Sequence, residues 1–196
     1  IYYLRQTCEA LHEAHASGLI HRDIKPGNIF AAQRGGVYDV VKLLDFGLAK
    51  PLPNARGPAM ELTLDGSITG SPLFMSPEQA LGENEPDARG DIYSLGAVAY
   101  YMLTAHAPFE GDTAMKVLVA HAREQPVPPS QRRSDIPSDL EQVVLRCLAK
   151  RPEDRFPDAQ SLAQALSECA AAADWSRERA EQWWYESENV LASAAG

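Results

Sequence analysis

The stretch "HRDIKPGNIF" at residues 21–30 concentrates polar side chains that could carry out chemistry. Asp23 can accept a hydrogen bond from an attacking hydroxyl, and Lys25 lies on the same side of an extended segment, within reach of a transferred phosphate. Asn28 and, further on in "VKLLDFGLAK" (41–50), Asp45 offer oxygen ligands for Mg²⁺ or Mn²⁺. Each of these residues could also be an ordinary turn former. Together they predict phosphoryl transfer.

Short elements are expected to position these loops. Apolar residues at helical spacing predict a first helix that ends at Gly18. Three short apolar runs predict strands on either side of the polar loops, at residues 19–20, 29–31 and 40–44. Residues 48–77 show no clear periodicity and are rich in Pro, Gly, Ser and Thr, so a long functional loop is expected there.

The rest of the chain predicts helices. "DIYSLGAVAYYMLT" (91–104) is apolar nearly all round, Met102 included, and should be deeply buried. A further helix is expected near 112–123, another after a capping box of Ser138 with Glu141, and a last one capped by Asp158. Strands followed by helices indicate an α+β fold that is mainly α-helical.

Composition narrows the class of protein. The chain has 196 residues and 45% hydrophobic content, enough for one good-sized core. A net charge of −9 argues against a nucleic-acid partner. The three cysteines are widely spaced, and Cys8 and Cys147 fall on apolar helix positions, so reduced core thiols in a cytosolic protein are expected.

"HRDIKPGN" followed by "DFG" resembles, position by position, the catalytic and metal-binding loops of eukaryotic-like (Hanks-type) protein kinases. The segment "TGSPLFMSPEQ" looks like the corresponding segment of the bacterial members of this family. The resemblance implies the C-terminal lobe of the protein-kinase-like fold, with ATP and Mg²⁺ or Mn²⁺ as cofactors and proteins bearing Ser or Thr as substrates. By this resemblance Asp23 would be the catalytic base or hydroxyl-orienting residue, with Lys25 beside it. Asn28 and Asp45 would be metal ligands next to ATP, and Phe30 would lie beneath the adenine ring. The residues that assemble the site would be His21, Phe46 and Gly47.

Two further contacts follow from the same resemblance. "SPE" at 76–78 would close an activation segment that begins at Asp45, with Glu78 in a buried ion pair with Arg155 of "RPEDRF". The alternative for these two residues is a loose surface pair. Asp91 would hold the main chain of the catalytic loop, because an acid buried there without partners would be costly.

The resemblance also predicts specificity and regulation. Lys25, two residues after Asp23, is the pattern of serine/threonine kinases, and Ser71 would bridge Asp23 and Lys25 near the substrate hydroxyl. Arg22 would receive a phosphate from the activation loop. By their spacing the phosphorylation candidates are Ser67 and Thr69, with Thr63 behind them, and a homodimer would allow phosphorylation in trans.

The resemblance covers residues 1–168, which correspond to the second part of the kinase domain from the middle of its first long helix onward. The glycine-rich turn, the strand lysine and the helix glutamate of the smaller lobe are not in this sequence. The smaller lobe is therefore an expected partner, and the isolated chain is expected to transfer little phosphate. The kinase domain would be cytoplasmic, with any membrane anchor outside this segment.

Several alternatives remain. The chain could be a non-catalytic kinase remnant that acts as a regulatory module, a small-molecule phosphotransferase of the kinase-like superfamily, or a purely structural helical domain. Residues 169–196 form a tail whose tryptophans could pack back on the lobe, begin a linker or bind a partner.

Overall fold

The computed structural model describes residues 1–46, 72–82 and 87–194. Helices dominate this part of the chain, and its two strands form one hairpin, so the predicted mainly helical α+β fold is confirmed. The elements in chain order are α1 (Tyr2–Ala16), η1 (Pro26–Asn28), β1 (Ile29–Arg34), β2 (Val37–Leu43), η2 (Pro72–Phe74), α2 (Pro77–Ala80), α3 (Ala88–Thr104), α4 (Ala114–Arg123), α5 (Pro129–Arg132), α6 (Ser138–Cys147), η3 (Pro152–Asp154), α7 (Ala159–Glu168), η4 (Ala170–Ala173) and α8 (Arg177–Ala194).

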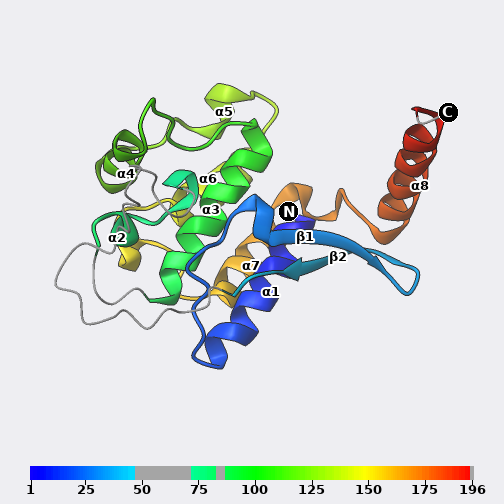
Figure 1. Ribbon diagram of the computed structural model, residues 1–196, viewed down its shortest axis with the longest axis horizontal. Helices are drawn as coiled ribbons and strands as arrows, with labels where there is room; N and C mark the ends of the chain where they lie inside the picture. Colours follow the sequence, from blue (N-terminus) through cyan, green and yellow to red (C-terminus); the bar gives the residue numbers. More distant parts are fainter. Residues whose placement is uncertain (47–71, 83–86, 195–196) are drawn as a thin grey trace, which may run out of the picture.

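Figure 1 shows the helical body on one side and the hairpin reaching away from it toward α8. Helix α3 runs through the middle of the body, between α6 on one side and α1 with α7 on the other. The candidate catalytic residues lie where the hairpin leaves the body, because η1 leads directly into β1 and β2 returns to residue 45.

Helix α1 ends as the sequence predicts. Gly18 has a φ of +77°, and its N–H donates to the His15 carbonyl at 2.9 Å. The next N–H, from Leu19, reaches back to the Ala14 carbonyl at 2.9 Å. These are the two hydrogen bonds of a Schellman motif, in which glycine takes the left-handed position without a steric penalty. The strand predicted at Leu19–Ile20 is wrong, because these two residues are not in a strand, and neither β1 nor β2 pairs with them.

The hairpin is closed by the pair Gly35–Gly36, whose φ values are +58° and +76°. Two positive φ values are what a two-residue type I′ turn requires. Ile29 pairs with Leu43 at the base of the hairpin. The ladder is irregular between Ala32 and Arg34, opposite the stretch in which Asp39 takes a φ of +55°. Asp39 is fully buried at this bulge.

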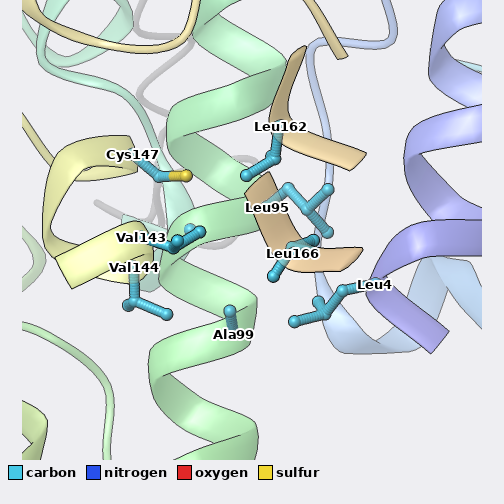
Figure 2. Close-up of a pocket in the computed structure, with 9 residues that line it drawn as sticks. Leu4, Leu95, Ala99, Val143, Val144, Cys147, Leu162 and Leu166 are labelled. Atoms are coloured by element: carbon cyan, nitrogen blue, oxygen red, sulfur yellow. The ribbon is translucent and has the colours of Figure 1, made fainter. Parts of the chain in front are cut away.

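The hydrophobic core is built around α3. Residues 91–100 are all buried, as the apolar sequence predicts, but Met102 is 48% exposed, contrary to expectation. Helix α6 approaches α3 closely at Gly96, where an added Cβ would lie 2.4 Å from the Cβ of Cys147. Figure 2 shows Leu95 of α3 among apolar side chains from α6, α7 and α1. The cavity between them, about 10 Å³, is lined by apolar side chains and offers a water molecule no polar side chain to bind.

One predicted helix start is correct and another is wrong. Asp158 accepts a hydrogen bond from the Ser161 N–H at 2.7 Å and caps α7 as expected. The capping box of Ser138 with Glu141 is not formed, because Ser138 is already inside α6 and Pro137 precedes it. The Glu141 carboxylate instead accepts a hydrogen bond from the Ser130 N–H at 2.6 Å. A neighbouring segment therefore takes the acceptor that the cap would have used.

The three cysteines are free thiols, and all are buried. Burial raises the pKa of the Cys8 thiol to about 12 and also raises that of Cys147. A thiol with a raised pKa is a poor nucleophile, so both behave as small apolar core residues. The prediction of reduced core thiols is confirmed, whereas the cytosolic setting stays a prediction.

Helix α8 belongs to the tail, which packs back on the hairpin through Trp175 and Trp184. Its sequence, "RERAEQWWYESENVLASA", carries charged residues up to Glu188. Among the described helices, α8 included, none is both long enough and apolar enough to cross a membrane.

Candidate active site

The loop at residues 21–28 is fastened to α3 through the buried carboxylate of Asp91, as predicted. Oδ2 of Asp91 accepts a hydrogen bond from the His21 N–H at 2.8 Å, and Oδ1 accepts one from the Arg22 N–H at 2.8 Å. Nε2 of His15 lies 2.9 Å from Oδ2. Arg22 has a φ of +66°, a conformation that costs a non-glycine residue about 1–2 kcal/mol. The two main-chain hydrogen bonds hold the loop in a turn that its own sequence disfavours.

Asp23, Lys25 and Asn28 lie together, as the spacing predicts. Lys25 Nζ donates to Asp23 Oδ2 at 2.6 Å, and Asn28 Nδ2 donates to the main-chain oxygen of Asp23 at 2.8 Å and to Oδ2 at 3.1 Å. The Lys25 and Asp23 side chains are 31% and 40% exposed, so their ion pair adds little to stability. Both contacts fix the Asp23 carboxylate through Oδ2. Among the described residues none donates to Oδ1, which can therefore accept a hydrogen bond from a hydroxyl.

The two candidate metal ligands lie at the same end of the hairpin. Asn28 precedes β1 directly, Asp45 follows β2 after one residue, and the Leu44 N–H donates to the Asn28 carbonyl at 2.8 Å. Both hydrogen bonds that the buried Asn28 side chain makes to described residues use its amide nitrogen, so within this part of the chain its amide oxygen is left for a metal. The Asp45 side chain is exposed.

A magnesium ion fits this donor set. Mg²⁺ uses only one or two protein ligands and completes its shell with phosphate oxygens and water. In the described ranges no group of three or more His, Cys, Asp or Glu side chains could hold a metal ion. The pair of one amide oxygen and one carboxylate is therefore suited to a metal that arrives with a phosphate, and not to a metal caged by protein alone.

His21 joins the catalytic loop to the segment that carries Asp45. Its Nδ1 accepts a hydrogen bond from the Asp23 N–H at 3.3 Å, which assigns the ring proton to Nε2. Nε2 then donates to the Leu44 carbonyl at 2.9 Å. The Phe46 ring lies 4.8 Å from the imidazole, tilted by 53°, so the predicted packing of these two rings is confirmed. Phe30 is 55% exposed on β1, and its place beneath an adenine ring stays a prediction.

The predicted ion pair of Glu78 with Arg155 is confirmed, and it is buried. The guanidinium binds the carboxylate in a bidentate manner, with both N–O distances 2.8 Å. The remaining N–H groups of Arg155 donate to the main-chain oxygens of Arg89, Ala149 and Lys150 at 2.8 to 3.0 Å. All five donors of the guanidinium are thus used, which is the condition under which a buried charge is tolerated. The alternative of a loose surface pair is wrong.

Five predicted residues lie outside the described part of the chain: Gly47, Thr63, Ser67, Thr69 and Ser71. Their roles stay predictions. So does the role of Arg22 as a phosphate receiver, although its side chain is exposed on the loop and could meet one.

The structure adds two positioning contacts that motif reading missed. Gln79 of α2 donates from Nε2 to the Arg22 carbonyl at 2.8 Å, and its Oε1 accepts from the Ser76 N–H at 3.1 Å. His15 completes the Asp91 cluster from α1. Gln79 could have been found, because Ser76 followed by Gln three residues later is a capping-box signature. His15 carries no such signal in the sequence.

Comparison with known proteins agrees with this geometry. The model of the protein kinase domain family matches residues 2–167, which is most of the chain. The chain belongs to the protein kinase family. The resemblance drawn from the two loop motifs is thereby confirmed.

Three of its relatives are bacterial serine/threonine-protein kinases. It is 46% identical over 163 residues to the serine/threonine-protein kinase Pkn1 of Myxococcus xanthus, covering 83% of this chain and 23% of that protein. It is 41% identical over 162 residues to the serine/threonine-protein kinase PknB of Mycolicibacterium smegmatis, covering 83% of this chain and 25% of that protein. The serine/threonine-protein kinase pkn3 of Myxococcus xanthus is 43% identical over 164 residues, with 82% and 29% covered. The chain thus spans about a quarter of the length of these relatives.

Proposed function

We propose that the full-length protein containing this chain is a serine/threonine protein kinase that transfers the γ-phosphate of ATP to hydroxyl groups of proteins. One observation carries the proposal: Asn28 holds the carboxylate of Asp23 through its amide nitrogen, while the Leu44–Asn28 main-chain hydrogen bond keeps Asp45 at the same end of the hairpin. A proton acceptor and two metal ligands therefore share one site. Three relatives named as serine/threonine kinases support the substrate class.

Each residue has a part that its contacts allow. Asp23 orients the attacking hydroxyl through Oδ1, and Lys25, already 2.6 Å from Oδ2, offers its ammonium group to the transferred phosphate. Asn28 and Asp45 hold Mg²⁺, which when bound neutralises charge on the phosphate oxygens. His21 contacts both the catalytic loop and the segment that carries Asp45. Asp23 therefore keeps its position relative to the two proposed metal ligands. Phe30 offers an exposed ring to the adenine.

The remaining proposals concern partners and regulation. A phosphate on Ser67, Thr69 or Thr63 would pair with Arg22, whose main chain is held by Asp91 and Gln79. A homodimer would place one copy's activation segment at the other copy's site. The smaller lobe of the kinase domain would complete the nucleotide cleft, and the domain would work in the cytoplasm.

Transfer of labelled γ-phosphate to a Ser/Thr-containing protein tests the proposal. The full-length protein should transfer phosphate with Mg²⁺ present and stop when the metal is chelated. Asp23→Asn should lower the rate at least about 100-fold, because a positioned acid–base group contributes that much. Asp112→Asn is the matched control, since Asp112 is an exposed acid paired only with Lys116.

Two outcomes would contradict the proposal. If Asp23→Asn transferred phosphate at the wild-type rate, Asp23 would not be the catalytic base or hydroxyl-orienting residue. If the full-length wild type transferred none, even with Mn²⁺, the non-catalytic remnant would be the better description. Mapping of the phosphorylated residues tests the regulatory part, which fails if phosphate appears only outside residues 61–71.

A further inference from the structure

The kinase motifs leave one buried acid without a role. Asp39 on β2 is fully buried, yet none of the described cations pairs with it. Its Oδ1 accepts hydrogen bonds from the Tyr3 hydroxyl and the Trp184 Nε1–H, both at 2.7 Å. Its Oδ2 accepts one from the Trp175 Nε1–H at 2.8 Å. A buried carboxylate is costly unless hydrogen bonds replace its water, so these three neutral donors form a built site.

The three donors come from three parts of the chain. Tyr3 belongs to α1, Trp175 to the connection after η4, and Trp184 to α8. A fourth side chain, Gln6 of α1, donates to the Asp39 carbonyl at 2.8 Å and accepts from the Val41 N–H at 3.1 Å. Helix α1 therefore braces the bulge from the body side, whereas both indoles come from the tail. Figure 1 shows α8 at the far end of the molecule from α2 and α4, beside the hairpin.

The hairpin that the tail contacts is flanked by both candidate metal ligands. Asn28 lies just before its first residue and Asp45 two residues after its last. The Ile29–Leu43 pair and the Leu44–Asn28 hydrogen bond join the two strands at that end. A change in the conformation of β2 can therefore alter the positions of Asn28 and Asp45 through this short strand pairing.

We propose that Asp39 is a positioning residue and that, with Trp175 and Trp184, it forms a latch that holds the C-terminal tail on the hairpin and keeps Asn28 and Asp45 in register. When the tail leaves, Asp39 loses two of its three side-chain donors and must be hydrated. The left-handed bulge, with a φ of +55°, is then free to relax. The metal part of this inference rests on the proposed function.

The latch is suited to reversible opening. Of its donors, Trp175 and Trp184 are only half-buried, and α8 packs chiefly against β2. An indole released from Asp39 can donate to water, so opening leaves no trapped donor behind. Docking and release of the tail would thus change the fraction of molecules in which the hairpin holds Asn28 and Asp45 in the metal-binding arrangement.

The test compares two tryptophan variants of the full-length protein. Trp175→Phe combined with Trp184→Phe removes both indole donors and keeps most of the ring volume. Trp183→Phe is the matched control, because the neighbouring Trp183 is 51% exposed and makes no hydrogen bond to Asp39. Amide hydrogen exchange of residues 37–44 reports the hairpin. Mn²⁺ titrated with saturating ADP reports the metal site, when the free-Mn²⁺ resonance signal is compared with the same titration of ADP without protein.

We expect the double variant to exchange its hairpin amides at least about ten-fold faster and to bind Mn²⁺ about three- to ten-fold more weakly. Trp183→Phe should match the wild type in both measurements. Wild-type exchange in the double variant would overturn the latch, and faster exchange with unchanged Mn²⁺ affinity would overturn its positioning role. Neither measurement needs phosphate transfer. Failure of the proposed function would appear differently, as no Mn²⁺ binding by any of the three proteins.

Discussion

Two buried carboxylates bind segments that adjoin the site, and they are satisfied in different ways. Asp91 in the helical body accepts main-chain N–H groups of the catalytic loop. Asp39 on the hairpin accepts side-chain donors, two of them from the tail. The buried N–H of His21 cannot reach water when its acceptor is lost, whereas indoles near the surface can. The helical body is thus a fixed support for the catalytic loop, and the tail contact is proposed as an adjustable one.

The body should therefore lose more stability than the hairpin when one polar partner is removed. The largest loss is expected at the ion pair of Arg155 with Glu78. Arg155→Ala leaves the Glu78 carboxylate buried without a partner and should lower the free energy of unfolding by about 3–5 kcal/mol. Denaturant titration measures this change. Arg155→Met combined with Glu78→Leu should be less harmful than Arg155→Ala alone, and a more harmful double variant would contradict this explanation.

The second-largest loss of stability is expected for Asp91→Ala. It leaves the N–H groups of His21 and Arg22 without acceptors and should lower the free energy of unfolding by about 3 kcal/mol. The same change frees the strained Arg22 turn, so phosphate transfer should fall more than 100-fold even where the protein is still folded. Denaturant titration and a rate measurement at low temperature separate the two effects. A folded Asp91→Ala protein with the wild-type rate would show that the loop does not need this support.

The body should also be the pH-sensitive region, because of His121 on α4. Its Nδ1 lies 2.8 Å from the Tyr93 hydroxyl, its Nε2 has no partner among the described residues, and burial lowers its pKa to about 4. Below pH 6.5 the unfolded state takes up a proton that the folded state does not, so stability falls as the pH drops toward 4. Between pH 7 and pH 5 the loss should be about 2 kcal/mol.

Urea unfolding of the wild type and of His121→Gln at pH 7 and pH 5 checks this. The variant removes the titrating group, so its stability should depend less on pH over that interval. An equally steep dependence in the variant would assign the effect to other groups.

The smallest effect on stability is expected on the hairpin side. Asp39→Ala frees one hydroxyl and two indoles that can turn to water, so the free energy of unfolding should fall by only about 1 kcal/mol. Tryptophan emission should shift to the red at the same time, because all three tryptophans of the chain lie in the tail. A loss as large as that of Asp91→Ala would erase the distinction between the two regions.

The sequence predicts the contacts within the helical body far better than the contacts between the hairpin and the tail. Asp91, Glu78 and Arg155 fall in motifs whose resemblance to protein kinases implies their contacts, and both predicted contacts are present. Asp39 sits in the apolar run "VYDVV" with no motif around it, and its indole donors are 136 and 145 residues away. Nothing local links them, because the contact depends on a bulge that only the folded ladder reveals.

Local signals also fail where a neighbour competes. Ser138 and Glu141 have the spacing of a capping box, yet the Ser130 N–H takes the Glu141 carboxylate. Leu19 and Ile20 have the character of a short strand, but neither strand in the described part of the chain pairs with them. In both cases tertiary contacts decide between options that the sequence leaves open.

The most direct test of the central assignment separates the two acids of the site by their metal dependence. Phosphate transfer by the full-length protein is measured over a range of Mg²⁺ concentrations for the wild type, Asp23→Asn and Asp45→Asn. Asp45→Asn should raise the Mg²⁺ concentration for half-maximal rate at least about ten-fold, since it removes the only carboxylate proposed as a ligand. Asp23→Asn should lower the maximal rate without moving that concentration. An unchanged Mg²⁺ requirement in Asp45→Asn, or an equal shift in both variants, would contradict the division into a hydroxyl-orienting acid and a metal ligand.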